Sequence, residues 1–320
     1  MPASPSPATT DVHQHLWTEP LLDALAARDR LPFVTRGDGT AIVHCAGEQA
    51  YAIDLTTENA ARRARLARDE GLDLVLIAPS SPIGMECLPR AEAHKLIEAH
   101  LAGVEDASEP FQTWGPVALD QPDADDVDDL LARGCVGISL PAGGLSTPDD
   151  LDHLEPVIAR AANLNAPVFV HPGPGLGRPN REPSLTEPVW WAAMTDYIAQ
   201  MQAAWLTFAA LGRRRYPRLR VLFALLAGGA PLLSERLGAR GGPPIELRDP
   251  LTFYETSSFG RGAIEAMVER VGVDQLVYGS DRPVVEPAQT GWEHTLQANA
   301  TRLLQTKPGK RRTDSTTVAV

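Results

Sequence analysis

Short apolar runs alternate with longer amphipathic stretches along most of this chain. The apolar runs cover residues 12–16, 73–78, 114–119, 135–140, 167–171, 219–226, 252–257 and 275–279. The amphipathic stretches repeat apolar residues at helical spacing over residues 19–30, 58–70, 90–102, 123–133, 148–163, 190–211, 231–240, 263–271 and 292–304. Apolar strands that alternate with helices indicate a parallel sheet covered on both faces. Eight strands within 320 residues therefore predict a single (β/α)8 TIM barrel of the α/β class.

Two segments interrupt this alternation. Residues 33–55 contain short runs around the turn Gly37-Asp38-Gly39, which predicts a small antiparallel β-hairpin inserted after the first strand. Residues 172–188 are rich in proline and glycine, which predicts an irregular lid loop over the strand ends after the fifth strand. The polar ends, 1–10 and 306–320, are expected to be disordered tails beside one barrel domain over 11–305.

Charge and composition narrow the class of partner. The formal net charge is -12, so an extended basic surface for nucleic acid is not expected. No apolar run approaches the roughly 20 residues that cross a bilayer, and residues 1–10 lack the basic and apolar segments of a signal peptide. We therefore expect a cytoplasmic protein that acts on a small-molecule substrate and has no nucleic-acid or membrane partner.

Histidine and aspartate side chains follow three of the predicted strands. His13 and His15 lie two residues apart at the end of the first strand, so both point to one side of it. His171 ends the fifth strand, and Asp281 follows the eighth. The carboxyl ends of the strands meet at one face of a parallel barrel, and imidazole and carboxylate groups are common zinc ligands. The pattern predicts that these four side chains bind a divalent metal ion, with zinc as the expected ion.

The few lysines restrict this metal chemistry further. The only lysines are Lys95, Lys307 and Lys310, and none of them lies at a strand end where a carbamylated lysine could bridge two metals. We therefore expect one ion. Such an ion lowers the pKa of its bound water to about 7, and Asp281 is then both a ligand and the expected catalytic base.

These motifs together resemble the amidohydrolase-related family, also called amidohydrolase 2, within the metal-dependent hydrolase superfamily. The resemblance rests on Asp-Val-His-Gln-His-Leu-Trp near the N-terminus, Phe-Val-His-Pro-Gly in mid-chain and Tyr-Gly-Ser-Asp-Arg-Pro near the end. The same family includes the aminocarboxymuconate-semialdehyde decarboxylase branch. The resemblance implies the barrel fold and a homodimer, and it assigns the metal ligands to His13, His15, His171 and Asp281.

One position departs from the family pattern. The family carries a histidine on the sixth strand, in a pattern such as Ala-His-x-Gly-Gly, which moves protons beside the metal-bound water. The matching stretch of this chain is Ala-Leu-Leu-Ala-Gly-Gly, which places Leu225 where that histidine belongs. A leucine side chain neither accepts nor donates a proton. Another group must therefore serve as the base, unless the reaction needs none there or catalysis has been lost.

Five further side chains are candidate substrate contacts. Arginine grips a carboxylate through two hydrogen bonds, and arginines lie on the hairpin, in the lid loop and next to Asp281, at Arg36, Arg178 and Arg282. Trp17 follows the histidine pair and either lines an apolar pocket or packs a helix against the barrel. The same two alternatives stay open for Trp190 and Trp191, which follow the lid loop. His44 lies on the hairpin, which contributes substrate contacts in the family the chain resembles.

Three functions stay open at this point. The first is a mononuclear metal-dependent hydrolase, in which metal-bound water attacks an amide, ester or lactone carbonyl of a small, carboxylated substrate. The second is a metal-dependent non-oxidative decarboxylase of an aromatic or unsaturated acid. The third is a catalytically impaired barrel that binds a ligand without turnover. Leu225 weakens decarboxylation more than hydrolysis, because protonating carbon demands a positioned acid. We therefore rank the hydrolase first from the sequence.

Overall fold

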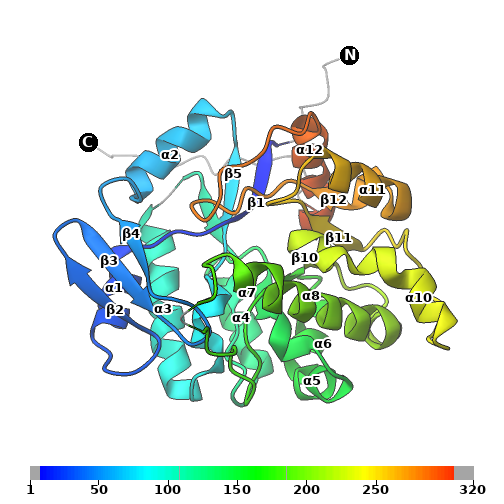
Figure 1. The fold of residues 1–320 in the computed structure, drawn as a ribbon, viewed down its shortest axis with the longest axis horizontal. Helices are drawn as coiled ribbons and strands as arrows, with labels where there is room; N and C mark the ends of the chain where they lie inside the picture. Colours follow the sequence, from blue (N-terminus) through cyan, green and yellow to red (C-terminus); the bar gives the residue numbers. More distant parts are fainter. Residues whose placement is uncertain (1–7, 108, 185, 306–320) are drawn as a thin grey trace, which may run out of the picture.

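The computed structural model describes residues 8–107, 109–184 and 186–305. Within these residues, parallel strands form a closed barrel surrounded by helices (Figure 1). Its strands are β1 (Thr10–Gln14), β5 (Leu74–Ile77), β6 (Phe111–Thr113) with β7 (Gly115–Pro116), β8 (Ile138–Pro141), β9 (Val168–His171), β10 (Val221–Phe223), β11 (Thr252–Glu255) and β12 (Leu276–Val277). The barrel closes where Val12 N donates to Tyr278 O at 3.0 Å and Asp281 N donates to His13 O at 2.9 Å. The predicted TIM barrel is confirmed.

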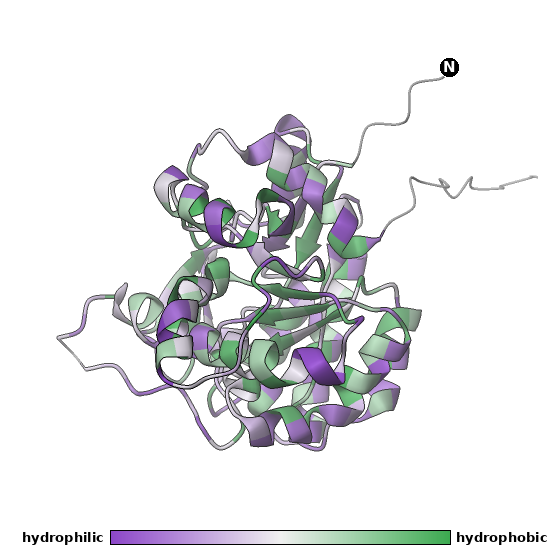
Figure 2. Ribbon diagram, turned by 90° about the vertical axis from the view of Figure 1, so that its right-hand side faces the viewer, coloured by the Kyte–Doolittle hydropathy of each residue, from purple (hydrophilic) through white to green (hydrophobic). Residues whose placement is uncertain are grey.

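The helices cover the outside of the barrel, and most of them bury one face. They are α1 (Glu19–Ala26), α2 (Ala60–Asp69), α3 (Arg90–Ala107), α4 (Ala124–Ala132), α5 (Pro148–His153), α6 (Glu155–Asn163), α7 (Trp191–Met194), α8 (Asp196–Thr207), α9 (Arg213–Arg215), α10 (Ser234–Ala239), α11 (Arg261–Val271) and α12 (Glu293–Leu304). In α1, for example, Leu21, Leu22 and Leu25 are buried. Figure 2 shows apolar strands at the centre and more polar residues on the outer helices, as burial of the apolar side chains requires.

Several predicted elements differ from the structure. The helix expected over 148–163, for example, is divided into α5 and α6. The third strand was expected over 114–119, but it begins at Phe111 and is interrupted at Trp114. The chain changes partner there, since β6 pairs with β5 and β7 pairs with β8, and Pro116 has no N–H to continue a ladder. The helix expected over 190–211 is broken at Thr195 and ends in a π-helical turn at Phe208–Gly212.

The inserted segment forms a three-stranded antiparallel sheet. Strands β2 (Phe33–Gly37), β3 (Thr40–His44) and β4 (Tyr51–Asp54) pair in that order, which confirms the predicted hairpin after the first strand. The β3–β4 connection packs on the loop at 172–188. A Cβ on Gly47 would lie 2.0 Å from Cβ of Asn180, and Gln49 Nε2 donates to Glu187 O at 2.8 Å. The irregular loop after β9 is therefore present over its described residues, and the small sheet contacts it.

The segment after β10 has an unusual backbone. Leu225, Leu226, Ala227, Gly228 and Gly229 all have positive φ, between 50° and 74°. Residues other than glycine adopt this left-handed conformation at a cost of roughly 1–2 kcal/mol each. A Cβ on Gly228 would lie 2.7 Å from Ile198 O, so α8 packs too closely for a larger residue there. This tight turn places Leu225 at the carboxyl end of the barrel.

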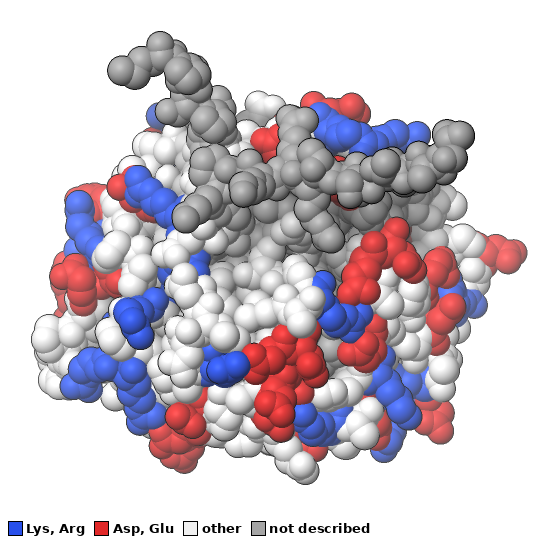
Figure 3. All heavy atoms as spheres, turned by 180° about the vertical axis from the view of Figure 1, so that it is seen from behind, with Lys and Arg blue, Asp and Glu red and all other residues white. Residues whose placement is uncertain are grey.

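The first strand extends into the predicted N-terminal tail. Strand β1 begins at Thr10, inside the segment expected to be a tail, and Thr9 N donates to Asp73 Oδ2 at 2.9 Å. The other tail residues, 1–7 and 306–320, lie outside the described residues. No helix among the described residues is long and apolar enough to cross a membrane. On the described part of the rear face, acidic and basic side chains are interspersed (Figure 3).

Candidate metal centre and substrate pocket

Four potential metal ligands converge at the carboxyl ends of β1, β9 and β12. Their ligand atoms all lie within 4.8 Å of one another, and they belong to His13, His15, His171 and Asp281. The Nε2 atoms of His13 and His15 are 3.3 Å apart, which is about the separation of two nitrogens that share one ion at about 2.0–2.1 Å. The structure thus brings together all four residues that the sequence singled out, in an arrangement that could hold a divalent ion.

The outer nitrogen of each imidazole faces an oxygen. Nδ1 of His15 lies 3.0 Å from Ala78 O, and Nδ1 of His171 lies 2.8 Å from Pro172 O. Nδ1 of His13 lies 3.2 Å from a carboxylate oxygen of Glu255. A proton on each Nδ1 leaves each Nε2 with a free lone pair, and these atoms point to the common centre. This is the orientation that ligating histidines have in metal sites, so the residues present fit a metal ion.

Burial and neighbouring charges control the protonation of these groups. Burial, together with His13 and His15, lowers the pKa of His171 well below its usual value, so this imidazole is neutral. Burial also lowers the pKa of His13, but Glu255 and Asp281 more than offset this and raise it overall. Burial raises the pKa of Asp281, but His13 and His15 more than offset this effect and lower the pKa overall. The carboxyl group is therefore ionised. A cation at the centre would displace a proton from His13.

Asp11 holds the first and last strands together beneath the centre. Its carboxylate accepts hydrogen bonds from His13 N at 3.0 Å, Ser280 N at 3.1 Å and Gln14 Nε2 at 2.7 Å. Asp281 itself has a positive φ of 56°, a conformation that aspartate tolerates better than most residues. These contacts fix the backbone of His13 relative to that of Asp281.

Glu255 connects three strands behind the metal centre. Besides facing His13, its carboxylate accepts hydrogen bonds from Ser257 Oγ at 2.9 Å and from Leu225 N at 3.1 Å. Gly279 leaves the space that this carboxylate fills, because a Cβ there would lie 2.3 Å from Oε1 of Glu255. Sequence reasoning missed Glu255. Its position at the end of a predicted strand, like that of His171, was the available signal.

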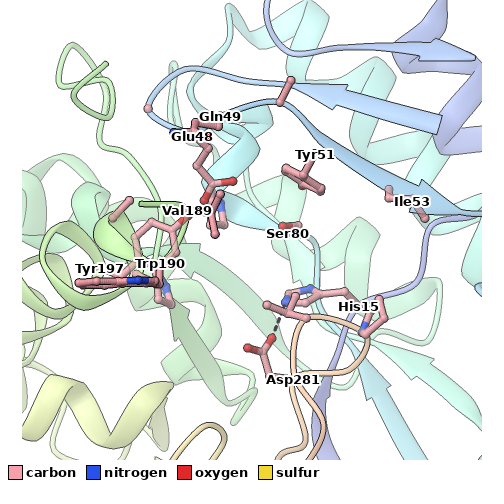
Figure 4. A pocket seen from close by; sticks show the side chains of 18 of the residues that line it. His15, Glu48, Gln49, Tyr51, Ile53, Ser80, Val189, Trp190, Tyr197 and Asp281 are labelled. Carbon is pink, nitrogen blue, oxygen red and sulfur yellow. Dashed lines mark ion pairs between the residues drawn. The ribbon is translucent and has the colours of Figure 1, made fainter. Parts of the chain in front are cut away.

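The metal centre forms the floor of a cavity of about 660 Å³. Glu48 and Tyr51 extend into it from the small sheet on one side, and Trp190 and Tyr197 line the opposite side (Figure 4). We call these four residues the distal wall. Of these four, only Trp190 was expected from the sequence to line a pocket. The Tyr197 hydroxyl is buried and has no hydrogen-bond partner among the described residues, which is a costly arrangement unless a ligand supplies the partner.

Of the five expected substrate contacts, one lies in the lining of the cavity. Trp17 lines the cavity. His44 stacks on Phe33, with ring centroids 4.4 Å apart. The three arginines are not among the lining residues and pair with acidic groups elsewhere: Arg36 with Glu19 at 2.6 Å and with Asp23, Arg178 with Asp150, and Arg282 with Glu70 at 2.7 Å. Leu225, in contrast, faces the cavity and is half-buried.

Comparison with known proteins places the fold. No protein-family model and no curated protein matches the sequence. Among solved structures, IDCase from Metarhizium anisopliae is similar with a TM-score of 0.68 and 17% identity, covering 92% of this chain and 90% of that one. A 5-carboxyvanillate decarboxylase from Novosphingobium aromaticivorans, complexed with manganese and 4-hydroxy-3-methoxy-5-nitrobenzoic acid, has a TM-score of 0.66 and 17% identity, covering 93% and 96%.

A third similar structure is an amidohydrolase. A putative amidohydrolase from Staphylococcus aureus has a TM-score of 0.63 and 14% identity, and the match covers 94% of this chain and all of that one. Identities of this size are evidence for the fold alone. Over most of its length, therefore, this chain has the fold of amidohydrolase 2 structures, which include metal-dependent decarboxylases, as the resemblance of its sequence motifs implied.

Proposed function

We propose that this protein is a metal-dependent enzyme that removes CO2, without an oxidant, from an aromatic or unsaturated carboxylic acid. The observation that carries the proposal is the composition of the cavity: four potential metal ligands form its floor, and no Lys or Arg is among the described residues that line it. A bound ion would then be the main cationic feature available to a substrate carboxylate. Aromatic walls above it suit a flat, apolar ring.

The metal would be held by His13, His15, His171 and Asp281. When bound, a divalent ion supplies a Lewis acid that attracts and orients a carboxylate. Three imidazoles and one carboxylate suit zinc, which is the ion expected from the sequence, whereas the similar 5-carboxyvanillate decarboxylase contains manganese. Elemental analysis of the purified protein identifies the resident ion.

Asp281 is the group we assign to proton transfer. A substrate carboxylate beside it would raise its pKa through repulsion between like charges, against the lowering by His13, His15 and a bound cation. The proposal requires that this repulsion let Asp281 take up a proton. Asp281 then donates its proton to the carbon that bears the carboxylate. The bond from that carbon to the carboxylate breaks, its electron pair returns to the π system, and CO2 leaves. Asp281 is left as a carboxylate and regains a proton from water.

This ranking differs from the order suggested by the sequence alone. Leu225 removes a proton-transfer group from the sixth strand, which favoured hydrolysis, but Asp281 lies 3.0 Å from His15 Nε2 at the centre of the floor and can serve as acid or base. Hydrolysis of an ester, amide or lactone is the second candidate. The observation in its favour is that hydrolysis needs only a base beside the bound water, a role that Asp281 can also take.

One experiment separates the two reactions. Protein loaded with manganese or with zinc is incubated with carboxyl-labelled aromatic acids that carry hydroxyl or amino substituents, and labelled CO2 is measured. The same preparations are assayed with p-nitrophenyl acetate and with a lactone. We expect CO2 release that is lost in Asp281→Asn, whose amide keeps the shape but not the basicity. Hydrolysis without CO2 release from any acid in the panel would overturn the proposal.

A further inference from the structure

The distal wall contains an acidic group without a counter-ion. Besides Asp281 on the floor, four acidic residues line the cavity: Glu48, Asp54, Glu58 and Glu187. Glu58 pairs with Arg63 at 2.7 Å, and Glu187 pairs with Arg181 at 2.9 Å. Glu48 has no ion-pair partner among the described residues, and its only hydrogen bond is a weak one from Cys45 Sγ at 3.9 Å. Two of these four carboxylates are thus paired with arginine, and Asp54 is exposed and accepts hydrogen bonds from N and Oγ1 of Thr56. Glu48 is the half-buried carboxylate left without an ionic partner.

Burial makes this unpaired carboxylate costly. Glu48 is half-buried in the β3–β4 connection, and burial raises its pKa to about 7. A partly desolvated carboxylate is unfavourable unless a cation or hydrogen-bond donor approaches it. Among the described residues the protein supplies no cation and only the weak Cys45 donor, so a ligand could supply a stronger partner.

The surroundings of Glu48 favour a cation over other ligands. Tyr51 and Trp190 present aromatic rings to the same cavity (Figure 4), and such rings attract ammonium groups through their negative faces. An ammonium group also has three N–H donors for carboxylate and hydroxyl oxygens. A second anionic group would meet Glu48 and no lining Lys or Arg, so like-charge repulsion would exclude it.

We propose that the distal wall is a subsite for a protonated amine, with Glu48 as its counter-ion and Trp190 as its aromatic contact. This inference rests on the proposed function and deepens it. The substrate is then an aromatic or unsaturated acid whose carboxylate lies at the metal and whose far end carries an amine. Acids with a second carboxylate at the far end are rejected.

Benzylamine and benzyl alcohol test the subsite because they have the same shape and differ in charge. The full-length protein, with and without manganese, is titrated with each at pH 8 while its tryptophan fluorescence is followed. We expect benzylamine to bind at least tenfold more tightly than benzyl alcohol. Glu48→Gln should abolish that difference, whereas Glu187→Gln, which alters a lining glutamate already paired with arginine, should keep it. Circular dichroism and the affinity for benzyl alcohol check that each variant is folded.

Two results would overturn the subsite. One is equal binding of the two probes to the native protein, and the other is an unchanged preference in Glu48→Gln. Neither probe has a carboxylate, so this outcome does not depend on decarboxylation. If benzylamine is selected but no acid loses CO2, the proposed reaction fails and the subsite stands. If acids lose CO2 while terephthalate binds as tightly as 4-(aminomethyl)benzoate, the reaction stands and the subsite fails.

Discussion

The floor and the distal wall of the cavity are built in different ways. On the floor, His13 and His171 are at most 5% exposed, sit at strand ends, and have their outer nitrogens facing a fixed oxygen. On the wall side, Val189 is 82% exposed and Trp190 is 55% exposed, and both belong to a segment outside the barrel strands. We infer that the barrel strands position the candidate metal centre, whereas the loops and the inserted sheet would select the substrate.

The same contrast holds for the charged groups. Carboxylates at the floor are tied into the backbone, since Asp11 joins β1 to the end of β12 and Glu255 joins β11 to His13 and Leu225. Glu48 on the wall has no comparable contacts. Changes at the floor should therefore affect metal binding and the chemical step, and changes at the wall should affect substrate affinity alone.

Removing one floor ligand should have the largest effect. We expect His171→Ala to lower metal content from one ion per chain to below one tenth and to reduce turnover at least about 10³-fold, because even partners behind the ligands contribute about 10–100-fold. A chelator should lower the melting temperature of the native protein but not that of the variant, since bound metal stabilises the folded state. His94→Ala, on helix α3, is the control. Full metal content in His171→Ala would refute the ligand assignment.

Displacing the Glu255 carboxylate, which faces His13, should have the next largest effect. Gly279→Ala would place a methyl group 2.3 Å from Oε1 of Glu255 and push this carboxylate away from His13. We expect metal affinity to fall about 10–100-fold, as for other partners of ligating histidines. Gly260→Ala is the matched control, because a Cβ there meets nothing within 4 Å. Competition with a metal-binding dye measures both. Equal affinities would show that Glu255 does not position His13.

The sequence predicted the floor better than the wall for a physical reason. Barrel strands are buried on both faces and appear as uninterrupted apolar runs, so a polar residue at the end of such a run, such as His171, is conspicuous. Pairing of the parallel strands then brings these strand-end residues to one face of the barrel, although they lie far apart in the sequence. The turn Gly37-Asp38-Gly39 predicted the inserted sheet equally clearly. In the structure Gly39 has a positive φ of 67°, a conformation that glycine adopts readily.

The wall depends on contacts that no local pattern contains. Arg36, Arg178 and Arg282 matched the pattern of carboxylate-binding side chains, but whether an arginine faces a cavity depends on which acidic groups lie nearby in space, and each has such a partner elsewhere. Glu48 was hidden for the converse reason, because an unpaired carboxylate looks the same in sequence as a paired one. The left-handed turn that aims Leu225 at the cavity gave no signal either, since leucine rarely adopts that backbone.

A buried acid in the segment after β5, Glu86, should make stability depend on pH. Glu86 is fully buried and accepts a hydrogen bond from Ser81 Oγ at 2.6 Å, and burial raises its pKa to about 7. The folded state therefore binds more protons than the unfolded state between about pH 4.5 and 7, so stability falls as pH rises through this range. We expect Glu86→Gln to gain about 2–3 kcal/mol relative to the native protein between pH 5 and pH 8. Urea unfolding at both pH values measures this gain, and a pH-independent difference would contradict it.

Shortening a side chain of the distal wall should change substrate affinity without changing the metal content. We expect Trp190→Ala to raise KM about tenfold, because an aromatic contact contributes about 0.5–1.5 kcal/mol beyond its buried area, with kcat and metal content nearly unchanged. Met194→Ala is the control, since Met194 is 63% exposed and is not a lining residue. Steady-state kinetics on an acid found to release CO2 distinguishes the two constants. A large fall in kcat would mean that the wall also positions the reacting groups.

Leu225→His should have the smallest effect. Leu225 lines the cavity, is only half-buried against the core, and has a positive φ, which histidine tolerates better than leucine does, so the variant should fold. A proton-transfer group contributes about 10²–10⁴-fold only when a partner holds it in position. The carboxylate of Glu255, which accepts a hydrogen bond from Leu225 N, also accepts from N and Oγ of Ser257 and faces His13. A new imidazole would therefore rotate freely, and we expect turnover to change less than about threefold with one ion still bound. A rise of tenfold or more would show that the proton supply from Asp281 limits the native enzyme.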